Sequence, residues 1–171
     1  MMLKEMLTNA LEFNLKYAEE LVCDIPEELR FETGGRGLEN HAGFTLGHLV
    51  TALSLTIKYL GEGYDVSEEW DQLFRRKGPG DPTLPESEIL KYPASEKIIA
   101  ELRTKTLKLI KFINAMDEQE FGKQVGWRFK EYFPTMLDLL TFMCIEHSAM
   151  HLGQLAAWRR AKGYDSALKK L

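Results

Sequence analysis

The chain has 171 residues, of which 44% are hydrophobic and 28% are charged, and its net charge is −4. These values describe one folded domain, residues 1–171, rather than a disordered chain, and an acidic protein is not expected to need nucleic acid, because neutralising phosphates requires a basic face. No apolar run approaches the ~18 residues of a membrane span, and two cysteines are too few for a disulfide framework, so we expect a cytoplasmic protein without a membrane partner.

The first helix is predicted over residues 3–22, where apolar residues recur with helical spacing. Asn14 falls on the same face, and we interpret it as a hydrogen-bonded core residue. Pro26 ends this helix, because the residue before a proline avoids the α conformation. Three glycines between residues 34 and 37 predict a loop rather than a phosphate-binding turn, since no strand precedes them and no Lys-Ser or Lys-Thr follows.

A second helix is predicted to begin between residues 40 and 45 and to end near Leu60, where Gly61 and Gly63 stop it. Its apolar stripe contains His48, beside the small Gly47, which lets a neighbouring helix or a ligand approach. His41 lies two turns earlier, too far to share a metal ion with His48 along a rigid helix. We interpret His41 as a solvent-exposed residue where the helix starts.

The connection over residues 62–94 is rich in glycine and proline. Trp70, Leu73 and Phe74 form a small apolar cluster within it, consistent with one short helix. We predict a long crossover that joins non-adjacent helix ends and covers one end of the bundle.

A third helix is predicted from Ser95, as its N-cap, to about Ala115. The next irregular stretch, residues 117–133, is too aromatic for a solvated loop. We expect its aromatic residues to pack over the end of the bundle, with a pocket mouth as the alternative.

The fourth helix is predicted to start after Pro134 with a capping box formed by Thr135 and Asp138, and to end at Gly163. The basic residues at its end, Arg159, Arg160 and Lys162, are interpreted as a solvated complement to the helix dipole. Four amphipathic helices without a convincing sheet predict an all-α, four-helix bundle.

His147 and His151 are four residues apart, so both imidazoles project from one helical face and can bind one transition-metal ion. With His48 on a second buried stripe, they predict a three-histidine site in which all three rings are neutral, since burial penalises the charged form. Neutral imidazoles suit zinc, nickel, iron or copper, and three of them leave an open coordination position. The alternative is a set of core histidines satisfied by hydrogen bonds.

Two stretches carry a family resemblance: Thr45-Leu-Gly-His48-Leu on the second helix, and Glu146-His147-x-x-x-His151-x-Gly-Gln154-Leu on the fourth. They resemble the DinB-like family of metal-dependent bundle proteins, as does the long crossover. The resemblance implies up-down-down-up connectivity, a zinc or nickel ion on His48, His147 and His151, and frequent homodimers. Some relatives are transferases or isomerases that use bacillithiol, mycothiol or glutathione-like thiols.

We therefore expect a divalent-metal-binding protein, with an enzyme that activates a low-molecular-weight thiol or water for attack on a small electrophile as the first hypothesis. A non-catalytic metal-binding or dimerising stress-related protein is the second, and a purely structural bundle is the third. Gln154 is expected either to orient the bound species or to pack, and Glu146 is rotated away from the site. Cys144 is one turn before His147, where it is either a ligand or a small buried hydrophobe.

Overall fold

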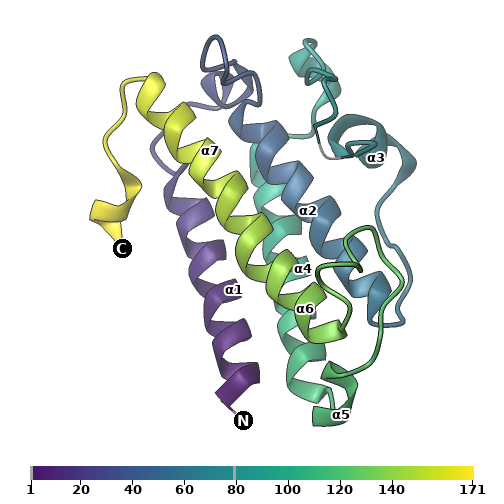
Figure 1. Ribbon diagram of the computed structural model, residues 1–171. Helices are drawn as coiled ribbons and strands as arrows, with labels where there is room; N and C mark the ends of the chain where they lie inside the picture. The colour runs from purple at the N-terminus through teal and green to yellow at the C-terminus, as the bar shows by residue number, and fades with distance from the viewer. Residues whose placement is uncertain (1, 79) are drawn as a thin grey trace.

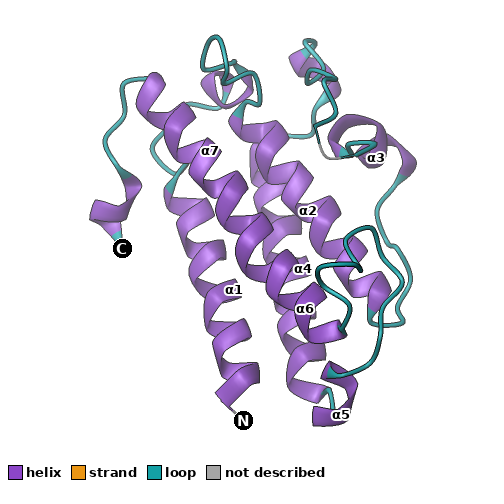
Figure 2. Cartoon of the chain, in the orientation of Figure 1, coloured by secondary structure: helices purple, strands orange, loops and turns teal. Residues whose placement is uncertain are grey.

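The computed structural model describes residues 2–78 and 80–171 and is built from helices and loops (Figures 1 and 2). The long helical segments are α1 (Met2–Glu20), α2 (Ala42–Tyr59), α4 (Ser95–Ala115) and the segment formed by α6 (Met136–Thr141), a π-helical turn (Phe142–His147) and α7 (Ser148–Ala161). The short helices are α3 (Glu68–Phe74), α5 (Glu118–Phe121) and four-residue or three-residue 3₁₀ turns at Glu28–Phe31, Ile89–Lys91 and Ala167–Lys170.

The four long segments lie side by side (Figure 1). α1 packs against α4 and α7, and α2 also packs against α4 and α7, so each long helix has two neighbours around a shared core. In the view of Figure 1, α1 and α6–α7 ascend while α2 and α4 descend. The all-α class is confirmed: the described residues contain no strand, and their only β-type pairing is an isolated bridge between Gln124 and Thr135.

The core is a continuous set of buried leucine, isoleucine and valine side chains contributed by all four long segments. α2 is the most enclosed of them, with 14 of its 18 residues buried, which explains why it is apolar around most of its circumference. Representative core residues are Leu7 and Leu11 of α1, Leu49 and Leu53 of α2, Leu102 and Leu109 of α4, and Leu152 and Leu155 of α7.

Local signals for helix ends are confirmed at three places. Thr135 and Asp138 form a reciprocal capping box at the start of α6. Gly61 and Gly163 take positive φ angles of 97° and 86° just past α2 and α7, a conformation that costs glycine little. The prediction for Ser95 was wrong: Ser95 is the first residue of α4, and its backbone N–H donates to the Glu27 carboxylate at 2.7 Å. A carboxylate from a distant segment thus does the work of a local cap.

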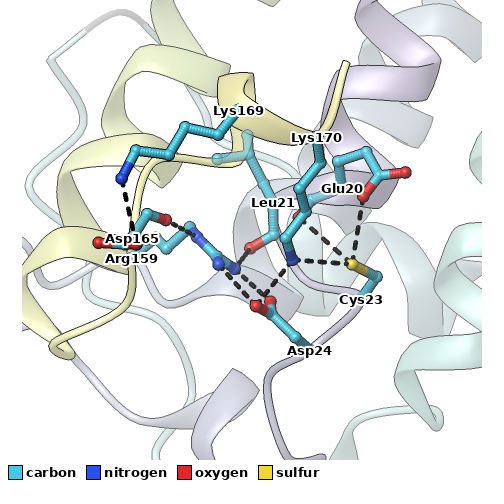
Figure 3. Close-up of polar contacts among 8 residues, drawn as sticks. All are labelled: Glu20, Leu21, Cys23, Asp24, Arg159, Asp165, Lys169 and Lys170. Atoms are coloured by element: carbon cyan, nitrogen blue, oxygen red, sulfur yellow. Dashed lines mark hydrogen bonds and ion pairs between the residues drawn. The ribbon is translucent and has the colours of Figure 1, made fainter.

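The interpretation of Arg159 as a solvated residue was also wrong. Its side chain is 1% exposed, and its guanidinium donates to both oxygens of Asp24 and to the carbonyl oxygens of Leu21 and Asp165 (Figure 3). The Arg159 guanidinium holds the pKa of the Asp24 carboxyl well below its usual range. Lys170 adds a second cation to Asp24 at 2.7 Å. This cluster fastens the end of α7 and the C-terminal turn to the end of α1.

The crossover between α2 and α4 carries α3, as the apolar cluster at Trp70, Leu73 and Phe74 predicted. α3 packs against α2, and the Trp70 indole N–H donates to the Gly47 carbonyl at 3.3 Å. In the described part of the chain, no helix combines the length and apolar character that crossing a membrane would require.

Candidate metal centre

His48 of α2 and the pair His147 and His151 of the fourth segment come together inside the bundle. Each ring offers a nitrogen, and these three nitrogens lie within 4.8 Å of one another. The ring centroids of His147 and His151 are 4.5 Å apart, and that of His48 lies 5.5 and 4.7 Å from them. All three side chains are half-buried. This geometry can hold a metal ion, whose identity the three imidazoles alone do not define.

The His48 ring is oriented by a backbone group of α3. Its Nδ1 lies 2.9 Å from the carbonyl oxygen of Phe74, so Nδ1 carries the proton and Nε2 is free to bind a metal. Gly47 makes this contact feasible: a Cβ atom there would lie 2.3 Å from the Phe74 ring. The element that approaches α2 closely at Gly47 is therefore α3, not another long helix.

The two histidines of the fourth segment differ in their partners. His151 Nδ1 lies 3.2 Å from the amide oxygen of Gln154, which likewise leaves Nε2 free. His147 Nδ1 is buried and has no hydrogen-bond partner. A buried nitrogen without a partner costs about 1–3 kcal/mol, a cost that coordination by a metal or a bound molecule would offset. Three neutral rings, two with a fixed tautomer and one with an unsatisfied nitrogen, fit a transition-metal ion.

His147 is the last residue of the π-helical turn Phe142–His147. Because π-helical bonding joins residues five apart, it brings Phe142 beside His147, with ring centroids 6.2 Å apart. Such turns disturb the carbonyl ladder, and here Asn14 of α1 donates to the Cys144 carbonyl at 2.9 Å. The interpretation of Asn14 as a hydrogen-bonded core residue is confirmed, and its partner is the irregular turn that precedes the cluster.

Burial sets the protonation of the cluster. It lowers the pKa of His147 to about 4 and, together with the charges of the other two histidines, that of His151 to about 3. It also lowers the pKa of His48, more than the Phe74 carbonyl raises it. The three rings are therefore neutral at pH 7, as their apolar stripes predicted, and need lose no proton to bind a cation.

The other candidate residues lie outside the cluster. Cys144 is fully buried, burial raises its pKa to about 12, and it is not grouped with the three histidines, so it is a small core residue. Glu146 is exposed, as its rotation along the helix predicted. His41 was predicted to be exposed and is 2% exposed: its Nδ1 caps α2 by accepting the Phe44 N–H at 3.0 Å. Burial lowers its pKa to about 4.

Aromatic residues wall the cluster on two sides. On one side the Phe44 ring stacks on His48 with 5.9 Å between centroids. On the other side Phe142 packs against the rings of three residues of the aromatic loop, Trp127, Phe129 and Phe133. Tyr132 alone of the loop aromatics points to solvent, 82% exposed. The aromatic loop therefore packs beside the candidate site. The sequence had left two alternatives open for its aromatic residues, packing over the end of the bundle and lining a pocket mouth.

Sequence reasoning missed two groups that lie close to the candidate site. The Phe74 carbonyl carries no signal in the side-chain pattern because it is a backbone group. Arg76 stands in a run of charged residues, Arg75-Arg76-Lys77, that is typical of a solvated loop, yet it is half-buried over the Phe44 ring at 4.0 Å.

The fold and the cluster define a class of protein: a helical bundle with three histidines gathered from two helices. Residues 10–155 match the model of the DinB superfamily, and the chain belongs to that superfamily. A comparison with curated proteins gives no significant match.

Acid is expected to destabilise the metal-free protein through its histidines. Unfolded histidines take up protons near pH 6.5, but His41 and His147 remain neutral until about pH 4. The unfolded state binds more protons between these values, so stability is complete above pH 6.5 and falls as pH drops toward 4, by about 1.4 kcal/mol per unit and per group. Urea unfolding at pH 7.5, 5.5 and 4.5 measures this. Equal unfolding free energies at the three values would contradict the assignment.

Gly47→Ala is expected to destabilise the fold by about 1–3 kcal/mol, since its Cβ would meet the fully buried Phe74 ring. Displacing Phe74 also moves the carbonyl that orients His48, so metal affinity should fall about tenfold. Chemical unfolding and metal titration measure the two effects. Gly153→Ala is the matched control, because nothing lies within 4 Å of that position, and it should be neutral or slightly stabilising.

Proposed function

We propose that this protein is a metal-dependent enzyme in which His48, His147 and His151 hold a divalent transition metal, zinc or nickel. The ion would activate a low-molecular-weight thiol or a water for attack on a small electrophile, as in a thiol transferase. The observation that carries the proposal is the set of three neutral histidines from two helices, which leaves coordination positions open to a second molecule. The paths of the four long segments support an up-down-down-up four-helix bundle.

The metal, when bound, supplies the Lewis acidity that lowers the pKa of a coordinated thiol or water. The residues of the chain orient the metal ligands and exclude water. The Phe74 carbonyl and the Gln154 amide fix two of the rings, and a fixed ligand set spares reorganisation during the reaction. Phe44 and Phe142 keep water from the sides of the cluster and so strengthen its electrostatic interactions.

The protein's own side chains favour this division of work. Cys144, the cysteine near the cluster, is a buried thiol with a raised pKa and cannot serve as a nucleophile at neutral pH. Apart from one another, the three cluster histidines contact two aromatic rings in the described part of the chain, Phe44 and Phe142, and phenylalanine offers no general acid or base. An exogenous thiol or water is therefore the nucleophile that fits.

Metal analysis of protein expressed without a polyhistidine tag tests the first step. One zinc or nickel ion per chain is expected, and less than a tenth as much in the triple variant His48→Ala, His147→Ala, His151→Ala. Full occupancy in that variant would refute the site. The second step is an assay of bacillithiol, mycothiol and glutathione with monochlorobimane and similar electrophiles, in which turnover should require the metal.

The apolar surroundings of the cluster also favour a second candidate, a metal-binding protein without catalysis, for which a stress-related role stays a prediction. It predicts stoichiometric metal with no turnover across the same panel of thiols and electrophiles. The homodimer and the cytoplasmic location stay predictions, and light scattering of the purified protein checks the former.

A further inference from the structure

Arg76 is a half-buried cation without an anionic partner. Within residues 2–78 and 80–171, its one hydrogen bond is from Nη2 to the neutral amide oxygen of Asn40 at 3.3 Å, and no carboxylate lies within 4.0 Å of its guanidinium. Burial lowers the pKa of Arg76. Taking a charge out of water is costly unless it is paired. The cation–π contact with Phe44 and the hydrogen bond to a neutral amide offset this cost less fully than a carboxylate partner would.

The neighbouring charges are already engaged. Arg75, the preceding residue, pairs with Asp71 at 2.9 Å. Asp81 is near enough for its charge to raise the pKa of Arg76, but its two oxygens accept the backbone N–H groups of Lys77 and Thr83 at 2.8 and 2.9 Å. Asp81 therefore shapes the loop, and the Arg76 guanidinium retains donors for a further acceptor.

The contact with Phe44 and the chain connection to Phe74 place Arg76 near the histidine cluster. Its Cζ lies 4.0 Å from the centre of the Phe44 ring, which stacks on His48 at 5.9 Å, and those two distances together limit how far the guanidinium can be from the His48 ring. Arg76 follows Phe74, whose carbonyl orients His48, by two residues.

Arg76, over the Phe44 ring, lies toward the end of the bundle at which Gln154 is exposed. Phe44 is one turn before His48 on the descending α2, and Gln154 is about one turn after His151 on the ascending α7, so both lie on the same side of the three histidines (Figure 1). Gln154 is exposed, so this side reaches solvent.

We propose that Arg76 binds a carboxylate carried by the small molecule that occupies the open metal position, which makes the substrate or thiol of this protein an anion. The planar guanidinium fork matches a carboxylate in two parallel hydrogen bonds, and the low dielectric beside Phe44 strengthens them. The proposal rests on the proposed function, because it names the chemical class of molecule that the metal position receives.

Cobalt(II)-loaded protein tests the proposal through the visible absorption of the ion, with two thiols of equal length as probes. 3-Mercaptopropionate carries the carboxylate, and 3-mercaptopropionamide is its neutral match. The native protein should bind the carboxylate thiol more tightly. Arg76→Gln should weaken that binding roughly tenfold to a hundredfold and leave the amide thiol unchanged. Arg75→Gln, a change at the neighbouring paired arginine, should alter neither affinity.

The outcomes separate the two proposals. Cobalt binding with equal affinity for both thiols, or a parallel loss of both in Arg76→Gln, would overturn the role of Arg76 and leave the metal site standing. Absence of cobalt binding by the native protein would overturn the proposed function and this inference with it. If Arg76→Gln does not fold, Arg76→Lys keeps the charge without the fork and should still reduce the preference for the carboxylate thiol.

Discussion

The variant that lacks His48, His147 and His151 is expected to lose the stabilisation that a divalent transition metal confers on the native protein. A ligand that binds only the folded state stabilises it by about 4 kcal/mol at a thousandfold excess over its dissociation constant. For a chain of this size that corresponds to a rise in melting temperature of roughly 8–16 °C. Thermal unfolding with and without zinc or nickel should therefore show this shift in the native protein and none in the triple variant.

Replacing a single histidine of the cluster separates its effect on the stability of the fold from its effect on metal affinity. His147→Ala should stabilise the metal-free fold slightly or leave it unchanged, because it removes a buried nitrogen without a partner, while lowering metal affinity. His41→Asn is the matched control, since asparagine can still cap α2 and His41 lies outside the cluster. A metal-induced shift that persisted in the triple variant, or vanished in His41→Asn, would contradict the assignment of the site.

Arg159→Met is expected to destabilise the protein by about 2–3 kcal/mol, less than the loss of a fully buried ion pair, because the Arg159 side chain is buried but that of Asp24 is 41% exposed. Methionine fills much of the volume but leaves the Leu21 and Asp165 carbonyls without their donor and Asp24 without its main cation (Figure 3). For a chain of this length the loss corresponds to a fall of roughly 4–12 °C in melting temperature. Urea unfolding with a constant m-value measures the change as one of stability rather than compactness.

Lys169→Ala is the comparison for that variant. Lys169 pairs with Asp165 at 3.2 Å in the same cluster, but the two side chains are 70% and 85% exposed, so its loss should stay within about 0.5 kcal/mol. Asp24→Asn should give an intermediate loss that disappears in acid, where the native carboxyl is itself protonated. Equal effects of Arg159→Met and Lys169→Ala would show that burial does not decide the strength of these pairs.

The long-helix pattern was accessible to sequence reasoning because it depends on local physics. The period of apolar residues located four helical segments, and the Thr135 capping box and the terminating glycines, Gly61 and Gly163, located three of their ends. His48, His147 and His151 could be named for a similar reason. Each lies on an apolar stripe, and such stripes meet in the core of a bundle.

Where reasoning failed, the partner came from a distant part of the chain. Arg159 has the local setting of a helix C-terminus, but Asp24, 135 residues earlier, draws it into the interior. Ser95 has the composition of a cap, but the carboxylate of Glu27 supplies that function. His41 was predicted to be exposed because it stands where a helix starts, and the packing of Phe31 and Tyr92 against its ring buries it.

The sequence by itself determined the helical class, the long segments and the three histidines, because periodicity and helix-end chemistry act over a few residues. Only the tertiary structure decided what surrounds those histidines. The Phe74 carbonyl on His48 and the Asn14 contact to the π-helical turn join residues far apart in the chain. The place of Arg76 over Phe44 likewise depends on how the crossover folds back on α2, which no local pattern specifies.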